Sequence, residues 1–330
     1  MTRTGNTYCD VRMAAGILRS GGVVALPTET VYGLGANALN ATAVARIFEI
    51  KERPRFDPLI VHVGSVDQAR QVVGQWPDAA DELARHFWPG PLTMVLGKSD
   101  DIPDIVTSGL PTVAVRMPDH PLALSVIDEA GLPIAAPSAN KFGCISPTTS
   151  QHVRRQLGED VDMVLDGGPC HVGIESTIVA LTEESPVLLR AGGTPPAAIE
   201  EVVGPIRQCG ADESRPTAPG QCPRHYAPRT PLILKEDATD LPVSPQAGLI
   251  VLQASADADR FKAVEVLSPS GNLQEAAAGL FAAMHRLDAM DLDYIVATKV
   301  PDTGLGLAIN DRLRRAAHRT HNVPMHKEPS

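Results

Sequence analysis

The stretch GGVVALPTETVYGLGANALNATAVARIFEIKERPRFDPLIVHV, residues 21–63, sets a dense group of hydroxyls, glycines and cations between two aliphatic runs. The first run, residues 23–26, predicts a short buried strand, and residues 28–35 predict a loop after it. The second run, residues 59–63, predicts the next strand. Polar side chains thus gather on connections between strands, which is where α/β proteins bind ligands.

A helix is predicted between these two strands. Asn40 is a suitable N-cap, and apolar residues recur at helical spacing after it. The cations Lys51, Arg53 and Arg55 crowd the end of this helix and the connection that follows. Positive charge is therefore expected near the polar loop.

Strand and helix patterns alternate without long gaps up to residue 203, which favours a mixed α/β sheet with covering helices over a barrel or a bundle. Further strands are predicted at residues 92–96, 112–117, 134–136, 162–165, 177–181 and 187–189. Helices are predicted before the Gly21-Gly22 pair and at residues 66–73, 78–87, 121–130, 146–157 and 195–203.

Periodicity is lost in residues 204–231, a proline-rich segment that predicts an interdomain linker. A smaller α/β domain is predicted over residues 232–320, with a tail at residues 321–330. Its strands are predicted at residues 248–253, 263–267 and 293–298, and its helices at residues 272–290 and 305–317. His318, His321 and His326 do not by themselves predict a metal site, since such a site needs converging ligands with outer-shell support.

Composition limits the classes of function. The 330 residues suffice for two domains, and the formal net charge of −10 with 4% aromatic residues argues against stable nucleic-acid binding. The five cysteines are odd in number and include no CxxC pair, so neither a zinc ribbon nor a disulfide framework is indicated. No secretion signal or run of membrane-spanning length is evident, and we expect a cytoplasmic protein with no membrane partner.

Common nucleotide and hydrolase motifs fail on their context. Gly97-Lys98-Ser99 lacks the earlier glycine of a P-loop. Residues 33–38 match GxGxxA, but residues 27–32 separate them from the strand, whereas the dinucleotide fingerprint turns directly from its strand. We interpret these glycines as positions where the backbone passes close to a ligand or a neighbouring helix. Ser138 and Ser176 lack the GxSxG context of a hydrolase nucleophile.

Two residues each leave two interpretations open. Arg116 stands among the aliphatic residues of a predicted strand, and a buried arginine needs an anionic partner. That partner is either a carboxylate of the chain itself or a carboxylate or phosphate of a ligand. Tyr226, in the linker sequence RHYAP, either fixes the linker to one domain or contacts the ligand.

The loop residues suit binding rather than nucleophilic attack. Lys51 and Arg53 offer charge for phosphates, and Arg116 offers a fork for a carboxylate. Directional hydrogen bonds are available from Thr30, Ser138, Asn140 and Ser176. Such a set fits a reaction run by positioning and charge, such as nucleotidyl transfer assisted by Mg²⁺.

Ordered motifs over roughly residues 10–203 carry a family resemblance. They are GGVVALPTETVYGLG, KERP, DPLIVHV, FWPGPLT, TVAVRMP, APSAN, SPTT, DGGP with GIESTIV, and LRAGG. In this order they resemble the threonylcarbamoyl-AMP synthase family with its YrdC-like fold. RHYAP and GLGLAINDRLRRAA resemble the long form of that family, in which a linker and a small Rossmann-like domain follow the catalytic domain.

The resemblance implies a fold and an activity. The fold is a YrdC-like twisted mixed sheet with covering helices at residues 10–203, a linker that serves as a lid at residues 204–231, and a Rossmann-like domain at residues 232–320. The activity is nucleotidyl transfer: L-threonine, bicarbonate and ATP, with Mg²⁺, give threonylcarbamoyl-AMP and pyrophosphate. The product passes to a tRNA threonylcarbamoyl transferase, for N6-threonylcarbamoyladenosine modification of tRNAs that read ANN codons.

The same resemblance implies site residues. Arg116 would bind the threonine carboxylate, and Lys51 and Arg53 would be catalytic residues facing the ATP phosphates. The other implied threonine-binding residues are Thr30, His62, Ala136 and Ser176. The other implied ATP-binding residues are Asp57, Thr112, Ser138, Asn140, Arg190 and Tyr226. No metal ligand is assigned, because Mg²⁺ is expected to be held through the ATP phosphates.

Asp57 departs from the family pattern, which usually has Asn before Pro-Leu-Ile-Val-His. Three interpretations stay open: its carboxylate repels phosphate, reaches Mg²⁺, or pairs with Arg53 or Arg55.

Two rival functions are weighed against synthesis. A non-catalytic YrdC-like RNA-binding or regulatory module is disfavoured by the acidic charge and the few aromatic residues. Carbamoyl transfer, as in related maturation proteins, is disfavoured because their acylphosphatase and zinc-finger regions are not found in this sequence.

Overall fold

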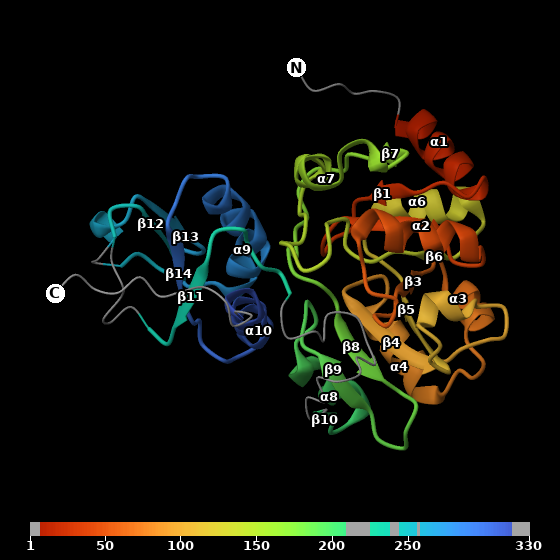
Figure 1. Ribbon diagram of the computed structural model, residues 1–330. Coiled ribbons are helices and arrows are strands. Elements are labelled where there is room, and N and C mark those ends of the chain that lie inside the picture. The colour runs from red at the N-terminus through yellow and green to blue at the C-terminus, as the bar shows by residue number, and fades with distance from the viewer. Residues whose placement is uncertain (1–6, 209–224, 238–243, 256–257, 319–330) are drawn as a thin grey trace.

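The structure is a computed structural model that describes residues 7–208, 225–237, 244–255 and 258–318. It contains two α/β units, built on a large mixed sheet and a small parallel sheet (Figure 1). The mixed α/β architecture expected from the alternating pattern is confirmed.

The large sheet has the strand order β10-β9-β8-β4-β5-β3-β6-β2-β1-β7. Its strands are β1 (Val24–Leu26), β2 (Gly33–Asn37), β3 (Ile60–His62), β4 (Leu92–Gly97), β5 (Thr112–Arg116), β6 (Ile134–Ala135), β7 (Met163–Val164), β8 (Thr177–Ala180), β9 (Val187–Arg190) and β10 (Arg207–Gln208). The sheet is mixed, since β5 pairs parallel with β3 and antiparallel with β4.

Helices cover this sheet. They are α1 (Thr7–Arg19), α2 (Ala41–Lys51), α3 (Val66–Val72), α4 (Asp78–Phe87), α5 (Asp104–Thr107), α6 (Pro121–Ala130), α7 (Ser150–Leu157) and α8 (Pro196–Val203). Alternation along β1 decides which face each side chain joins: Val24 and Leu26 pack with residues of α1 and α6, whereas Val23 and Ala25 join the main core with α2. Asn40 caps α2 as predicted, because its side chain accepts hydrogen bonds from the backbone N–H groups of Thr42 and Ala43.

The predicted loop at residues 28–35 is wrong in its second half, because β2 begins at Gly33 and pairs antiparallel with β1 and β6. A Cβ on Gly35 would lie 2.9 Å from Cγ2 of Ile134. Glycine here makes room for a neighbouring strand rather than for a helix. The helix predicted from residue 146 also starts later, at Ser150, where Thr149 is the N-cap.

The small sheet has the order β11-β14-β12-β13 and all its pairs are parallel. Its elements are β11 (Leu232–Lys235), β12 (Ala247–Val251), β13 (Ala263–Val266), α9 (Leu273–Asp288), β14 (Tyr294–Thr298) and α10 (Gly306–Ala317). The sequence did not predict α5, β10 or β11, which are only two to four residues long and lack a periodic pattern. Of the predicted linker, residues 209–224 lie outside the described residues, as do His321 and His326 of the tail.

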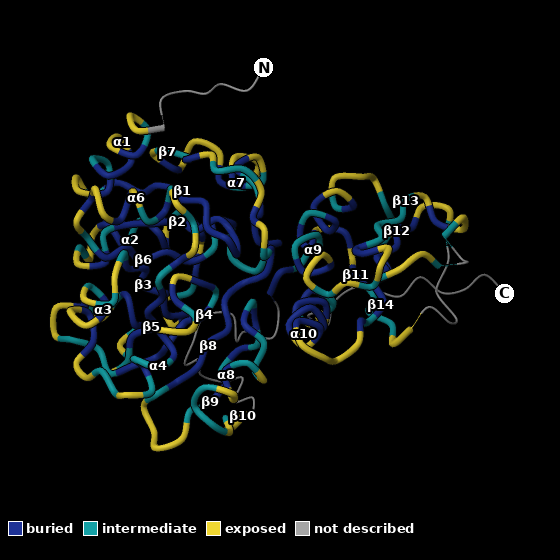
Figure 2. Tube along the Cα trace, turned by 180° about the vertical axis from the view of Figure 1, so that it is seen from behind, coloured by how far each residue is buried: buried dark blue, intermediate teal, exposed yellow. Residues whose placement is uncertain are grey.

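The two units share a hydrophobic core. Helices α9 and α10 lie between the small sheet and the large unit (Figure 1), and α10 is buried along much of its length (Figure 2). Val31, Ile145 and Ile174 of the large unit join one buried cluster with Phe281 of α9. The interface is therefore an apolar contact like a domain core.

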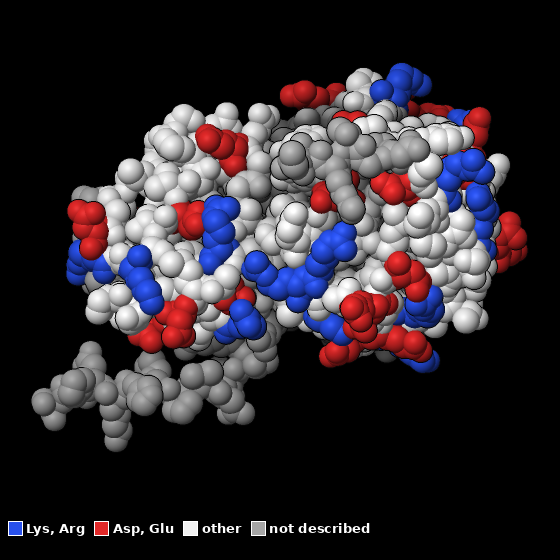
Figure 3. Space-filling model, turned by 90° about the horizontal axis from the view of Figure 1, so that it is seen from above, with Lys and Arg blue, Asp and Glu red and all other residues white. Residues whose placement is uncertain are grey.

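Charged side chains of both signs are interspersed on the face seen in Figure 3. None of the helices among the described residues is long and apolar enough to cross a membrane.

Candidate active site

A polar pocket lies where loops of the large sheet meet the segment that enters the small domain. The strands dictate part of this arrangement: β3 and β5 are parallel, and His62 pairs in register with Arg116 at their carboxyl ends. The pocket is lined by Thr28, Thr30, Val31, Gly33, Arg53, Ile60, His62, Arg116, Ala136, Pro137, Ser138, Glu175, Ser176, Arg190, His225 and Tyr226. All five implied threonine-binding residues line it, together with four of the implied ATP-binding residues: Arg53, Ser138, Arg190 and Tyr226.

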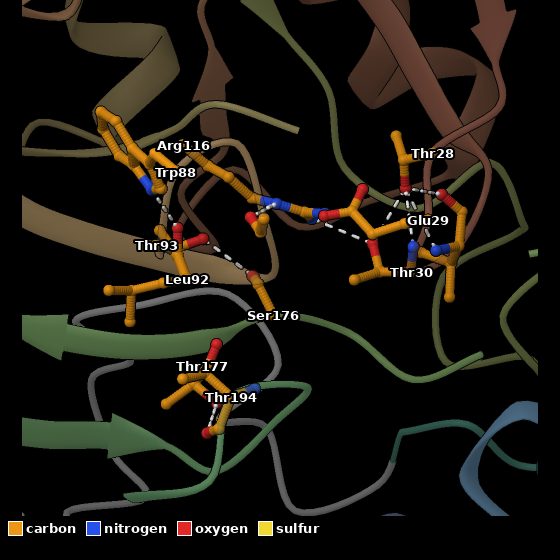
Figure 4. Close-up of polar contacts among 12 residues, drawn as sticks. Thr28, Glu29, Thr30, Trp88, Leu92, Thr93, Arg116, Ser176, Thr177 and Thr194 are labelled. Carbon is orange, nitrogen blue, oxygen red and sulfur yellow. Dashed lines mark hydrogen bonds and ion pairs between the residues drawn. The ribbon is translucent and has the colours of Figure 1, made fainter. Parts of the chain in front are cut away.

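Arg116 sits at one end of this pocket with three partners. Its guanidinium reaches from β5 toward the loop after β1 (Figure 4), with Nη2 at 2.5 Å from Oε1 of Glu29 and Nη1 donating to Oγ1 of Thr30 at 2.9 Å. Its Nε donates to the carbonyl of Gly90 at 3.1 Å. The two interpretations of Arg116 are thus compatible, because the side chain pairs with a carboxylate of the chain and also lines the pocket.

Ser176 and His62 complete this end. The Ser176 hydroxyl lies 2.7 Å from Oγ1 of Thr93 (Figure 4) and accepts a hydrogen bond from Nη2 of Arg190 at 3.2 Å. Burial and the nearby Arg116 lower the pKa of His62 to about 3. His62 is therefore neutral at physiological pH, and its Nδ1 has no hydrogen-bond partner among the described residues.

Arg53 also lines the pocket and is paired with Asp57. Its Nη2 lies 2.9 Å from Oδ2 of Asp57, and the two side chains are 3% and 0% exposed. Burial raises the pKa of Asp57, while the charges of Arg53, Lys51 and Arg190 lower it. Among the interpretations left open for Asp57, pairing with Arg53 is the one found in the structure.

Lys51 and Asn140 lie behind the pocket rather than on its wall. The Lys51 ammonium is buried and donates to the carbonyls of Ser138 and Asn140 at 2.6 and 2.5 Å. Burial and the charge of Arg53 lower the pKa of Lys51. The Asn140 amide donates to the carbonyls of Lys141 and Cys144. Both side chains hold the loop that presents Ser138 to the pocket.

Thr112 is not brought to this pocket. It begins β5, four residues before Arg116, and lines a separate cavity with Gln75, Trp76 and Leu181. Its assignment to the nucleotide site stays a prediction from the resemblance.

His225 and Tyr226 close the pocket from the side of the small domain. Tyr226 is buried and has φ of +62°, a left-handed conformation that is unusual for an aromatic residue. Its ring packs at 5.5 Å from that of Phe281. Of the two interpretations of Tyr226, contact with a domain is thus found, and the same residue lines the pocket.

Sequence reasoning missed Glu29, Glu175 and His225. Glu175 precedes Ser176 and His225 precedes Tyr226, so adjacency to a chosen residue was the available signal. Within the described residues no group of three or more His, Cys, Asp or Glu side chains could hold a metal ion. The carboxylates of Glu29, Asp57 and Glu175 each pair with an arginine.

Comparison with known proteins covers most of the chain. A family model described as "Telomere recombination" matches residues 16–192, and one described as "Threonylcarbamoyl-AMP synthase, C-terminal domain" matches residues 195–318. The threonylcarbamoyl-AMP synthase of Pyrococcus abyssi is 44% identical over 323 residues, which is 93% of this chain and 94% of the relative. That of Bacillus subtilis is 43% identical over 320 residues, or 93% and 92%. The crystal structure of P. abyssi Sua5 complexed with L-threonine is 43% identical in sequence, has a TM-score of 0.88, and covers 94% of each chain.

Proposed function

The chain belongs to the threonylcarbamoyl-AMP synthase family, a family of nucleotidyltransferases, and we propose that it condenses L-threonine, bicarbonate and ATP into threonylcarbamoyl-AMP and pyrophosphate. The observation that carries this proposal is the pocket itself. The five residues expected to bind threonine line the same pocket as Arg53 and Arg190, which are expected to bind ATP. We propose that the product serves N6-threonylcarbamoyladenosine formation in tRNAs, through a separate transferase in the cytoplasm.

Threonine is proposed to bind at the end formed by Arg116. The guanidinium offers charge to the amino-acid carboxylate, and the Thr30 and Ser176 hydroxyls with His62 offer hydrogen bonds. Because His62 is neutral, it does not repel the threonine ammonium, and Nδ1 is available to it. Ala136 lies close enough to line the same end with its backbone. A crystal structure of the P. abyssi relative holds L-threonine.

ATP is proposed to bind toward Arg53, Arg190 and Tyr226. The threonine amine would add to CO₂ with loss of a proton, or to bicarbonate with loss of water, to give a carbamate. A carbamate oxygen would then attack the α-phosphorus of ATP, and the bond from that phosphorus to the departing pyrophosphate would break. Nearby cations would stabilise the charge that develops on the phosphate oxygens, and the reaction needs no covalent nucleophile from the protein. Lys51 and Asn140 support this site by fixing the loop of Ser138, and Lys51 faces the phosphates only if its contacts with the carbonyls give way.

Mg²⁺ is proposed to accompany ATP. The three carboxylates buried at the pocket are already paired with arginines, so the phosphates and water would supply most of its oxygen ligands. When bound, the ion would neutralise phosphate charge.

Tyr226 and His225 are proposed to shield the reaction from water. Both side chains are buried and line the pocket. A carbamate and a mixed anhydride are labile to hydrolysis, so exclusion of water at this wall favours the product.

One assay tests the proposed function. The protein is incubated with ATP and bicarbonate, with and without L-threonine, and pyrophosphate release is measured. We expect release only with threonine, together with an adenylate of the mass of threonylcarbamoyl-AMP. Absence of pyrophosphate release would contradict the proposal and favour the non-catalytic module.

A further inference from the structure

Helix α10 of the small domain carries an arginine that contacts residues of the pocket wall without lining the pocket itself. The Arg312 side chain is 0% exposed, and its Nε donates to Oε2 of Glu175 at 2.8 Å. Glu175 belongs to the large unit, 137 residues earlier in the chain. A buried ion pair therefore joins the small domain directly to a residue that lines the pocket.

Glu175 has two described partners. Its Oε2 accepts from Arg312, and its Oε1 accepts from the Ser146 hydroxyl at 2.6 Å. Among these hydrogen-bond partners only Arg312 carries charge, and Arg190, which also interacts with Glu175 electrostatically, makes no hydrogen bond to it that the structure shows among the described residues. Without Arg312, a buried carboxylate beside Ser176 would repel an anionic nucleotide, because like charges interact strongly where water is excluded.

Asp311 is the second carboxylate next to Arg312, but it does not neutralise the Arg312 guanidinium on its own. Nη1 of Arg312 donates to Oδ2 of Asp311 at 2.8 Å, but Asp311 also accepts from Arg315 at 3.0 Å and lies 3.8 Å from Arg314. Burial alone would lower the pKa of Arg312, yet Tyr226, Glu175 and Asp311 together raise it. Arg312 is therefore charged, and that charge is available to Glu175.

The same guanidinium also supports Tyr226. It lies 5.0 Å from the centre of the Tyr226 ring, within the range of a cation–π contact. Tyr226 has a left-handed backbone conformation, which persists only where the surroundings fix it. Arg312 thus touches two residues of the pocket wall, and its Nη2 has no hydrogen-bond partner among the described residues.

We propose that Arg312 is a positioning residue of the active site: from the small domain it cancels the charge of Glu175 and holds Tyr226, so that the pocket accepts an anionic nucleotide. This rests on the proposed function, which puts ATP in the pocket. A buried ion pair is a poor source of stability, because apolar side chains often replace one without loss. The ion pair is better explained by its effect on the pocket: Arg312 neutralises the negative charge of Glu175, which would otherwise repel the nucleotide.

Calorimetric titration with MgATP tests this role. The variants are Arg312→Met, Glu175→Gln and the double variant, with Arg314→Met as a control that removes a 61% exposed arginine from the same helix. Arg312→Met is expected to weaken ATP binding at least about tenfold, which corresponds to about 1.4 kcal/mol. Adding Glu175→Gln to Arg312→Met is expected to restore most of that affinity, because the amide carries no charge. Arg314→Met is expected to bind as the wild type does.

Two further measurements test the proposal even if Arg312→Met fails to fold. Arg312→Lys keeps the charge and Arg312→Gln removes it, so Lys is expected to bind ATP at least about tenfold more tightly than Gln. Thermal unfolding of each variant is measured alongside, since a purely structural role would lower stability without rescue of affinity by Glu175→Gln. Equal ATP affinity for the wild type and Arg312→Met would overturn the proposal. So would equal affinity for Arg312→Lys and Arg312→Gln, or equal affinity for Arg312→Met and the double variant.

The readout separates this proposal from the proposed function. A wild type that binds ATP but releases no threonine-dependent pyrophosphate contradicts the function and still allows the affinities to be compared. A wild type that is active, with Arg312 variants that bind ATP normally, contradicts only the role of Arg312.

Discussion

The carboxylate of Asp57 lies 2.9 Å from the guanidinium of Arg53, and neither side chain is more than 3% exposed. Apart from this ion pair, no hydrogen-bond donor reaches either Asp57 oxygen among the described residues. Arg53 lines the pocket, so its charge is shared between a buried carboxylate and whatever anion the pocket receives. Pairing of Asp57 with Arg53 is thus found, whereas repulsion of phosphate and contact with Mg²⁺ stay predictions that depend on the bound nucleotide.

Asp57→Asn is expected to tighten ATP binding by about threefold to tenfold, because the amide leaves the charge of Arg53 to the phosphates. Calorimetric titration with ATP, in the presence and absence of Mg²⁺, measures this. Weaker binding that depends on Mg²⁺ would instead assign Asp57 to the metal.

Arg53→Met and Lys51→Met are each expected to lower kcat/KM for ATP by roughly a hundredfold, the usual cost of removing one preorganised donor. Arg53 would act on the phosphates, whereas Lys51 would act through the loop that its ammonium binds. Initial rates of pyrophosphate release give both values. Native rates in either variant would remove that residue from the phosphate site.

Arg116→Lys is expected to raise the KM for L-threonine by about tenfold or more, since a lysine cannot replace the fork that contacts Glu29 and Thr30 and that is proposed to bind the threonine carboxylate. The effect on the KM for ATP should be smaller. Arg85→Lys, at a side chain 64% exposed on α4, is the matched control. A larger effect on ATP than on threonine would contradict the assignment.

The free energy of unfolding is expected to fall as the pH drops from about 6.5 toward 4. His152 of α7 and His285 of α9 stack at 3.8 Å, and burial lowers their pKa values to about 3 and about 4. Because the pKa values in the folded protein lie below the value in the unfolded chain, the unfolded chain takes up protons first as the pH falls. Each imidazole then lowers the free energy of unfolding by up to about 1.4 kcal/mol per pH unit.

Denaturant unfolding of the wild type and of His285→Asn between pH 4 and 8 measures that loss. The free energy of unfolding of the variant should depend less steeply on pH. Some dependence should remain, because burial also lowers the pKa values of His62 and His225. Equal slopes would show that the stacked pair does not respond to acid.

A chain that ends at Val203 is expected to lose threonine-dependent pyrophosphate release. It lacks His225 and Tyr226 from the pocket wall, and it exposes Ile145 and Ile174, which pack against the small domain. Circular dichroism checks whether the large unit stays folded, and a chain ending at His318 is the control. Unchanged turnover in the shorter chain would contradict the shielding role.

Local patterns predicted most elements but not every partner. The bounds of α4 and α6 agree with the prediction because apolar spacing and a terminal proline or glycine mark them. Strand β2 was missed because Gly33 and Gly35 have low strand propensity, and only its neighbours on the sheet decide its state.

The candidate site shows the same limit. Thirteen different residues were implied for the site, and nine of them line one pocket. They lie on strand ends, on loops of the large sheet and on the segment that enters the small domain. The pairing of Glu175 with Arg312 was beyond reach, because nothing in either local sequence specifies a partner 137 residues away.

The buried contact of Arg312 with Glu175 also orders events during synthesis. A ribosome releases the chain from its N-terminus, so the loops that line the pocket emerge before α10 does. The Arg312 side chain can reach Glu175 only after α10 has left the ribosome. A nascent or prematurely terminated chain without α10 therefore lacks the counter-charge of Glu175, and on the role proposed for Arg312 it would not yet accept an anionic nucleotide.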